Sequence, residues 1–205
     1  MALNSFVYIS EINNLSDARY AAGMGVDLLG FNLDPNSESA LSQLQFNEIS
    51  EWISGVKIVG EFGNLDPDSV SKRLDEFAVD YLLISDESRL HEFEMLGLPL
   101  IFKVDFEEAD QNSLLSTLNY CSGSVDYFLL NSDHEDVSQV AKILIQSLDG
   151  KYPLLLGYGL HASNIAEVAA DKAITGISMK GSPELRPGYK DFDELAEILE
   201  SIEID

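Results

Sequence analysis

The sequence predicts a single-domain (β/α)8 barrel of the TIM-barrel class, with short loops, over residues 1–205. Three observations support this prediction. A short apolar strand pattern followed by an amphipathic helix pattern recurs eight times, at roughly 25 residues a unit. The strand patterns are continuously apolar, which is typical of parallel strands covered on both faces. No segment rich in Pro, Gly and Ser divides the chain into two domains.

The expected strands are short runs rich in Val, Ile, Leu, Phe and Tyr: Phe6–Ile9, Asp27–Leu33, Lys57–Phe62, Tyr81–Ile84, Leu100–Val104, Tyr127–Leu130, Leu154–Leu156 and Ile174–Ile177. Each is followed by an expected helix: Ser16–Met24, Phe46–Ile53, Asp68–Phe77, Glu87–Leu96, Ser113–Tyr120, Val137–Leu148, Ser163–Ala170 and Asp193–Ile202. Ser16 is the expected N-cap of the first helix, with Asp17 in its first turn. Trp52 is expected to pack in the core between helix and barrel.

Alternating strands and helices imply parallel pairing with right-handed crossovers. A doubly wound open sheet is the alternative architecture. The first strand–helix turn, Ser10–Leu15, lacks the GxGxxG run that a dinucleotide-binding sheet carries there. This absence favours the barrel and gives no sign of a nucleotide cofactor.

Composition and charge exclude several functional classes. The chain has 12 Lys and Arg against 36 Asp and Glu, a formal charge of −24, so nucleic acid and anionic membranes would be repelled. The single Cys121 excludes a disulfide framework and fits a reducing compartment. The N-terminal residues show no signal peptide, and no apolar run is long enough to cross a membrane. We expect a cytoplasmic protein, either monomer or homodimer.

Candidate catalytic residues lie where expected strands end, because barrels of this class carry their sites at that face. Glu11, Glu61 and Asp105 all fall at such ends, where they could raise one another's pKa and act as acid and base. With 36 acidic residues in the chain, chance placement is the competing explanation. Lys103 ends the fifth strand and fits either a Schiff-base lysine or an ion-paired one. No histidine has metal-ligand spacing, so no metal is expected.

Several short motifs occur in one collinear order along the chain. The N-terminal run Asn14–Ala22 (NLSDARYAA) is followed by Gly25, Asp27 and Gly30–Phe31. The later matches are Gly60, Phe62 and Asn64 in a run of the form VGVFVN, Gly159–Leu160 and Asn164 in GGLNPEN, and Gly176, Glu184, Pro187–Gly188 and Lys190–Asp191 near the end. In these motifs the chain resembles the phosphoribosylanthranilate isomerase family of tryptophan biosynthesis.

The resemblance implies an Amadori rearrangement of a phosphorylated aminoribose by one general acid and one general base, with no metal or cofactor. Four positions that it assigns to this chemistry are substituted. Ser10 stands at the family's base, a cysteine, and Asn131 at its acid, an aspartate. Ser39 stands at the arginine that holds the anthranilate carboxylate, and Ser178 at an aspartate after the eighth strand. Serine is a poor base at neutral pH, and asparagine has no titratable proton to donate.

The resemblance also implies a phosphate site in the loops after the seventh and eighth strands. Its expected residues are Gly157, Gly159, Lys180, Gly181 and Ser182. Glycine lets the backbone approach an anion closely, and Lys180 adds a positive charge. Tight barrel turns alone would also explain these glycines.

Three functions therefore remain open. The first is a barrel that binds a phosphorylated sugar or another small phosphate ligand but has lost the family's acid, base and carboxylate anchor. The second is an active aldose–ketose isomerase of the Amadori type that uses substituted groups such as Glu11, Glu61 or Asp105. The third is a non-catalytic interaction or regulatory protein.

Overall fold

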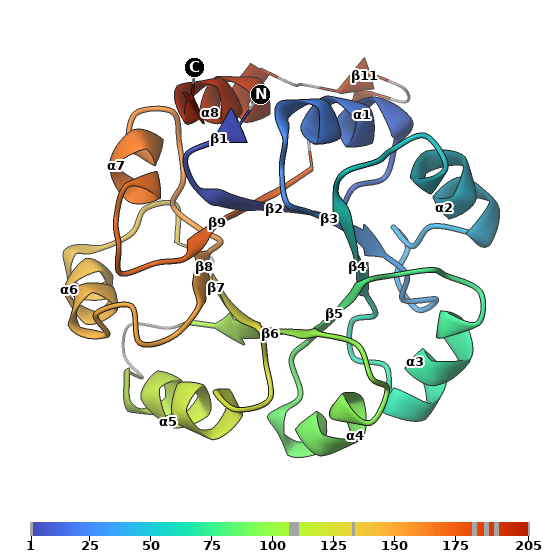
Figure 1. Ribbon diagram of the computed structural model, residues 1–205, viewed down its shortest axis with the longest axis horizontal. Coiled ribbons are helices and arrows are strands. Elements are labelled where there is room, and N and C mark those ends of the chain that lie inside the picture. The colour runs from blue at the N-terminus through green and yellow to red at the C-terminus, as the bar shows by residue number, and fades with distance from the viewer. Residues whose placement is uncertain are drawn as a thin grey trace.

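Eight parallel strands form a closed barrel (Figure 1), which confirms the predicted fold class. The computed structural model describes residues 2–106, 111–132, 134–181, 184–186, 189–190 and 193–204. In barrel order the strands are β2 (Phe6–Ser10), β3 (Leu28–Asn32), β4 (Lys57–Glu61), β5 (Tyr81–Ile84), β6 (Leu100–Asp105), β7 (Tyr127–Asn131), β8 (Leu154–Leu156) and β9 (Gly176–Lys180). The barrel closes where β2 pairs with β9, in a register running from Phe6 opposite Gly176 to Ser10 opposite Lys180.

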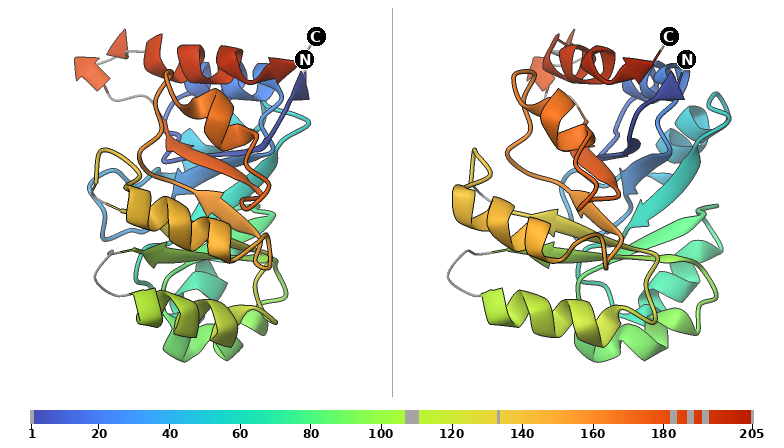
Figure 2. Two further views of the ribbon diagram at one scale, coloured as in Figure 1. Left: turned by 90° about the vertical axis from the view of Figure 1, so that its left-hand side faces the viewer. Right: turned by 60° about the vertical axis from the view of Figure 1, so that its left-hand side comes forward.

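Helices surround the barrel on the outside (Figures 1 and 2). They are α1 (Leu15–Met24), α2 (Gln43–Ser50), α3 (Pro67–Leu74), α4 (Leu90–Glu94) preceded by a 3-10 turn (Glu87–Arg89), α5 (Gln111–Cys121), α6 (Gln139–Ser147), α7 (Ile165–Ala169) and α8 (Asp193–Ser201). Two small antiparallel pairs complete the described structure: β1 (Ala2–Leu3) with β12 (Glu203–Ile204), and β10 (Glu184–Arg186) with β11 (Tyr189–Lys190). The first pair brings the two ends of the chain together. None of the described helices has the length and apolar character needed to span a membrane.

The helix ends differ from those expected because local capping groups set them. Helix α1 is capped by Asn14 rather than Ser16: the Asn14 side-chain oxygen accepts the Asp17 N–H at 2.9 Å. Helix α2 starts before Phe46, since Ser42 and Gln45 form a capping box. Apolar periodicity identifies the buried face of a helix but not its first residue.

The prediction for Trp52 was wrong. Its side chain is 68% exposed and lies beyond the end of α2. Phe46 and Ile49 supply the buried face of that helix instead. The expected helix Phe46–Ile53 extends about one turn past the observed end of α2 at Ser50. Trp52 was therefore assigned to the buried face of a helix that ends before it.

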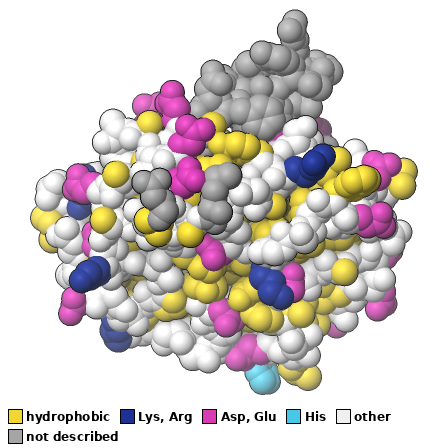
Figure 3. All heavy atoms as spheres, turned by 45° about the horizontal axis from the view of Figure 1, so that its top comes forward, with side chains coloured by type: hydrophobic (Ala, Val, Ile, Leu, Met, Phe, Trp, Pro, Cys, Tyr) yellow, Lys and Arg dark blue, Asp and Glu magenta, His cyan; other side chains and the backbone are white. Residues whose placement is uncertain are grey.

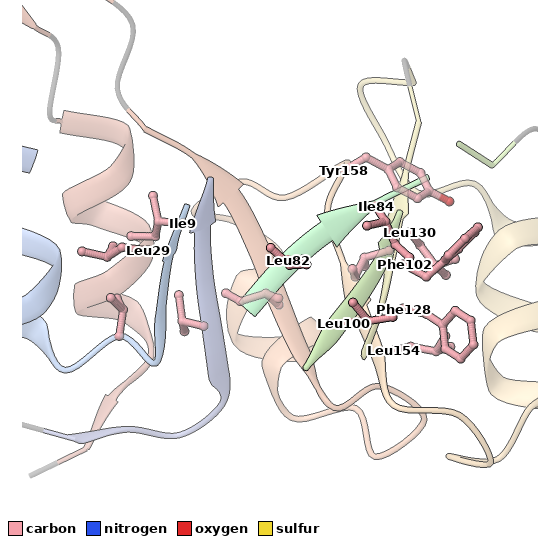
Figure 4. Packing of buried hydrophobic residues seen from close by; sticks show 14 of the residues in the cluster. Ile9, Leu29, Leu82, Ile84, Leu100, Phe102, Phe128, Leu130, Leu154 and Tyr158 are labelled. Carbon is pink, nitrogen blue, oxygen red and sulfur yellow. The ribbon is translucent and has the colours of Figure 1, made fainter. Parts of the chain in front are cut away.

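The barrel strands are apolar on both faces because each face contacts its own cluster. The outward side chains pack under the helices, as Phe102, Phe128, Leu130 and Leu154 do in Figure 4. The inward ones form a separate interior cluster: Tyr8, Leu28, Val59, Ile101, Leu129 and Leu155, bordered by Phe6, Tyr81, Leu83 and Tyr127. Burial on both sides explains the continuously apolar strand patterns. It also makes any polar side chain on an inward face a departure that needs its own partners.

We expect Gly176→Ala to destabilise the protein by about 1–3 kcal/mol. A Cβ at this position would lie 2.2 Å from the backbone oxygen of Phe6, so the β2–β9 pairing that closes the barrel would have to shift. The free energy of unfolding in urea measures the effect. Gly23→Ala in α1 is the matched control: a Cβ there meets no atom within 4 Å, and alanine favours the helix. Equal stability of the two variants would contradict the prediction.

Candidate active site

Two adjoining cavities open at the carboxyl ends of the barrel strands. The larger cavity, about 370 Å³, has Asn32, Asp34, Ser37, Gly63, Asn64, Ser85 and Asp105 in its wall. The smaller cavity, about 70 Å³, has Ser10, Leu129, Asn131, Gly157, Ser178 and Lys180 in its wall. Glu11, Glu61, Leu83 and Lys103 line both. Strand ends from all around the barrel therefore contribute to one mouth.

Glu61 is the buried carboxylate of this mouth. It ends β4 with its side chain directed inward and is only 7% exposed. The Tyr8 hydroxyl donates a 2.5 Å hydrogen bond to its Oε1, and the Glu11 N–H donates to both carboxylate oxygens, at 3.3 and 3.2 Å. Burial raises the pKa of Glu61 to about 7, against the opposing effect of these hydrogen bonds. The group can therefore hold or release a proton near neutral pH.

Gly30 makes room for this arrangement. A Cβ on Gly30 would lie 1.9 Å from Glu61 Oε1 and 2.5 Å from the Tyr8 hydroxyl. Both neighbours are the ends of side chains, so a larger residue at position 30 would displace the carboxylate and the hydroxyl rather than the strand. Because Gly30 on β3 has no side chain, it leaves the space in which Tyr8 of β2 and Glu61 of β4 form their hydrogen bond.

Glu11 links Glu61 to the far side of the mouth. Its backbone adopts φ +55°, a conformation that side-chain-bearing residues seldom take. This conformation directs its N–H toward Glu61, while its carboxylate pairs with Lys180 Nζ at 2.8 Å. Both side chains of the pair are about half exposed or more, so the pair adds little stability. The pair matters for the charge around Glu61, because it places one positive group, Lys180, and one negative group, Glu11, near that carboxylate.

Asp105 belongs to a second polar group across the mouth. Lys103 Nζ lies 3.3 Å from Asp105 Oδ1, and Asn131 Nδ2 donates to the same oxygen at 2.9 Å. Partial burial raises the pKa of Asp105, but the Asn131 hydrogen bond and the Lys103 charge outweigh it, so the pKa is below its ordinary value. Asp105 is therefore an ionised acceptor at neutral pH. Glu11, Glu61 and Asp105 do share one mouth, but the pKa of Glu61 is raised toward neutrality whereas that of Asp105 is lowered.

The four positions at which the resemblance implies substitutions lie on or near the same mouth. Asn131 and Ser178 line the smaller cavity, as does Ser10, whose hydroxyl donates to the Met179 carbonyl at 3.3 Å. Ser39 lies outside both lining sets, on the loop after β3, where its hydroxyl accepts from Asn32 Nδ2 at 2.8 Å. None of these four side chains bonds to Glu61 among the hydrogen bonds of the described residues.

The expected phosphate residues do not form one cluster in the described structure. Lys180 and Gly157 line the smaller cavity. The N–H groups of Gly157 and Gly181 donate to the carbonyls of Leu130 and Ser10, at 2.8 and 2.7 Å, and so belong to the barrel. Gly159 has φ +63°, and a Cβ there would lie 2.5 Å from the Val137 nitrogen, so this loop packs tightly against the chain before α6. Ser182 lies outside the described residues. The phosphate site stays a prediction.

Two other side chains take no part in the mouth. Tyr158 is buried in the cluster between barrel and helices (Figure 4) and lines neither cavity. Cys121 is buried at the end of α5, and burial raises the pKa of its thiol to about 11, so it stays protonated. Within the described residues, no group of three or more His, Cys, Asp or Glu side chains is arranged to hold a metal ion.

The sequence did not single out Tyr8 or Asp34 as candidate site residues. Tyr8 lies on β2 two residues before Ser10, and therefore on the same strand face, so the alternation of strand side chains could have placed it inside the barrel. Asp34 follows β3 in the loop that borders the larger cavity. Its place on the wall depends on how that loop folds, which no local pattern specifies.

Comparisons with known proteins identify relatives of the chain, although no family model matches it. The N-(5'-phosphoribosyl)anthranilate isomerase of Acidithiobacillus ferrooxidans is 28% identical over 199 residues, covering 93% of each chain. That of a Synechococcus species is 25% identical over 215 aligned residues, covering 96% of this chain and 90% of the relative. The chain is a distant relative of the phosphoribosylanthranilate isomerase family.

Solved structures of phosphoribosylanthranilate isomerases share the fold. That from Thermotoga maritima superposes with a TM-score of 0.79 at 21% identity, over 97% of this chain and 98% of its own. A phosphoribosylanthranilate isomerase in complex with reduced 1-(o-carboxyphenylamino)-1-deoxyribulose 5-phosphate gives a TM-score of 0.77, also at 21% identity. Against the family run VGVFVN, this chain reads Val59, Gly60, Glu61, Phe62, Gly63 and Asn64. Its buried carboxylate stands where that run has a valine.

We expect Glu61→Gln to stabilise the protein at alkaline pH and to have little effect in acid. The folded state holds the Glu61 proton up to about pH 7, whereas the unfolded chain releases it near pH 4.5. The wild type therefore loses stability as the pH rises from 4.5 through 7, by up to about 3 kcal/mol, and glutamine does not. Urea unfolding at pH 5 and pH 8 measures this. Glu51→Gln, at an exposed position, controls for removing one charge. A gain independent of pH would contradict the prediction.

Proposed function

We propose that this chain is an aldose–ketose isomerase for a phosphorylated sugar, with Glu61 as its proton-transfer group. The observation that carries the proposal is a carboxylate that is 7% exposed, lines both mouth cavities and has a pKa near 7. Strongly shifted carboxylates in a cleft are candidates for acid–base catalysis. Glu61 lies at the carboxyl end of β4, and barrels of this class have their active sites at that end of the strands.

The proposed chemistry needs one group that is both base and acid. In an open-chain aldose, the Glu61 carboxylate takes the proton from C2, and the carbonyl oxygen at C1 gains negative charge. Glu61 then returns the proton to C1, and a proton passes from the C2 hydroxyl to the C1 oxygen, which gives the ketose. A carboxyl with pKa near the working pH populates both of the forms it needs. Lys103, in the wall of both cavities, supplies positive charge for the enediolate.

Two observations support a phosphorylated ligand. Lys180 stands over the smaller cavity and supplies a cation in a chain of net charge −24. A relative with the same fold was crystallised with a ribulose 5-phosphate derivative. An anion that reaches Lys180 would compete with the Glu11 carboxylate, which now holds it.

A second candidate function is ligand binding without turnover. It is favoured by Ser10 and Asn131, which replace the base and acid that the resemblance implies. The two candidates make different predictions for a single experiment, because only the isomerase exchanges a carbon-bound proton with solvent.

We expect the wild type to exchange the C2 proton of ribose 5-phosphate in deuterium oxide. Consumption of phosphoribosylanthranilate, followed by loss of its fluorescence, is measured alongside. Glu61→Gln should lower the rate at least about 100-fold, since it removes the base. Nuclear magnetic resonance and fluorescence measure the two reactions, and circular dichroism checks the fold. Glu51→Gln is the matched control. Activity that survives Glu61→Gln would contradict the assignment. Inactivity of the wild type on both compounds, with binding retained, would favour the non-catalytic candidate.

The pH profile provides an independent check on Tyr8 as a positioning residue. The wild-type rate should rise with pH around a midpoint near 7, as Glu61 becomes the base. The Tyr8 hydrogen bond lowers the pKa of Glu61, so Tyr8→Phe should move that midpoint upward. A midpoint that stays in place would show that the hydroxyl has no such role.

A further inference from the structure

We infer that the larger mouth cavity selects a ligand end that donates hydrogen bonds and carries no carboxylate, namely a hydroxyl- or amine-bearing sugar end. The inference rests on the proposed function in one respect only, that the mouth is the ligand site. It differs from what the family resemblance implies, which is an aromatic carboxylate held at this side of the barrel.

The balance of charge in the wall of the larger cavity carries this inference. Among its described lining residues are four carboxylates, Glu11, Asp34, Glu61 and Asp105, and one cation, Lys103. Lys103 is already paired with Asp105 at 3.3 Å. The excess of acidic side chains is not confined to this cavity, since they are scattered over the face in Figure 3 with few basic ones among them. A ligand carboxylate in this cavity would be repelled by these carboxylates, and the lysine in the described wall is already paired.

Asp34 is the acceptor best placed to meet a ligand. Its Oδ1 accepts the backbone N–H and the side-chain Nδ2 of Asn36, at 2.9 and 3.0 Å, which fixes the carboxylate. Its Oδ2 would lie 2.3 Å from a Cβ on Gly63, a lining residue with φ +59°. Glycine at position 63 therefore leaves this oxygen beside the cavity rather than behind a side chain.

The neutral lining residues reinforce the selection. Asn32 uses its Nδ2 to donate to Ser37 Oγ and Ser39 Oγ, both at 2.8 Å, and its Oδ1 accepts the Asp34 N–H at 3.1 Å. Its amide hydrogens therefore hold the loop instead of facing a ligand. Ser39, where the resemblance implies an arginine that binds a carboxylate, is a partner in this loop network. The amide hydrogens of Asn32 are thus unavailable to a ligand, and the charged side chains of the wall are mainly acceptors.

The smaller cavity has a different charge balance, and the difference orients the ligand. Its described wall contains two carboxylates, Glu11 and Glu61, and two lysines, Lys103 and Lys180. The wall of the smaller cavity is therefore less negative than that of the larger cavity. This balance favours a phosphate at the smaller cavity, where it would compete with Glu11 for Lys180, and a hydrogen-bond donor at the larger one. Glu61 lies between the two, against the carbon atoms that join the ligand's ends.

The test uses three probes that share one phosphate: glucosamine 6-phosphate, glucose 6-phosphate and 6-phosphogluconate. Isothermal titration at pH 7.5 and fixed ionic strength should show that the first two bind at least about tenfold tighter than the carboxylate probe. Equal or tighter binding of 6-phosphogluconate by the wild type would overturn the inference.

Two variants identify the responsible groups. Asp34→Asn should reduce the discrimination against 6-phosphogluconate several-fold without changing the affinity for inorganic phosphate, and Glu51→Gln should leave both unchanged. Ser39→Arg should tighten 6-phosphogluconate selectively, because it adds a cation at the rim. If Asp34→Asn lowers all affinities equally, the carboxylate has no part in selection and the inference is wrong.

Failure of the proposed function would look different. If inorganic phosphate and all three probes fail to bind, the phosphate side of that proposal is wrong. The order of affinities is then measured with glucosamine, glucose and gluconate at millimolar concentration. Since these compounds lack a phosphate, the measurement tests the larger cavity alone. Absence of proton exchange, with the expected binding order intact, would contradict the isomerase and leave the selectivity standing.

Discussion

The pairing of the first barrel strand with the last is the constraint on which the rest of the structure depends. It closes the sheet, and its register places Ser10 opposite Lys180. Glu11 then follows β2 into the mouth, where it reaches Lys180 with its side chain and Glu61 with its N–H. Gly176 allows this close approach, since a Cβ there would meet the Phe6 backbone. The pairing that closes the barrel therefore also brings Glu11 and Lys180 together in the mouth.

Placing Glu61 inside the barrel has an energetic cost. A buried ionised carboxylate loses hydration, and the Tyr8 and Glu11 hydrogen bonds offset that loss only in part, since its pKa remains near 7. The neighbouring inward side chains are apolar, so the rest of the interior needs no such compensation. A buried carboxylate with a pKa near neutrality in an otherwise apolar interior is typical of a functional site.

Much of this arrangement was predictable, and the errors have physical causes. Strand existence and order followed from apolar runs that are buried on both sides. Helix ends did not, because side-chain caps such as Asn14 and Ser42 set them. Trp52 was misplaced because α2 ends at Ser50, before the last turn that the apolar pattern predicted. Three of the mouth carboxylates, Glu11, Glu61 and Asp105, were predicted as a group, but their individual roles were not.

The sequence by itself determined the barrel, its strand order and the set of polar residues at the strand ends. These depend on local periodicity and on the rule that parallel strands end at one face. Only the tertiary structure decided that Glu61 is buried under Tyr8, that Asp105 is ionised beside Lys103, and that Glu11 holds Lys180. Those relations join strands far apart in the sequence. They depend on register, on closure and on the space left by Gly30, and no local pattern encodes any of the three.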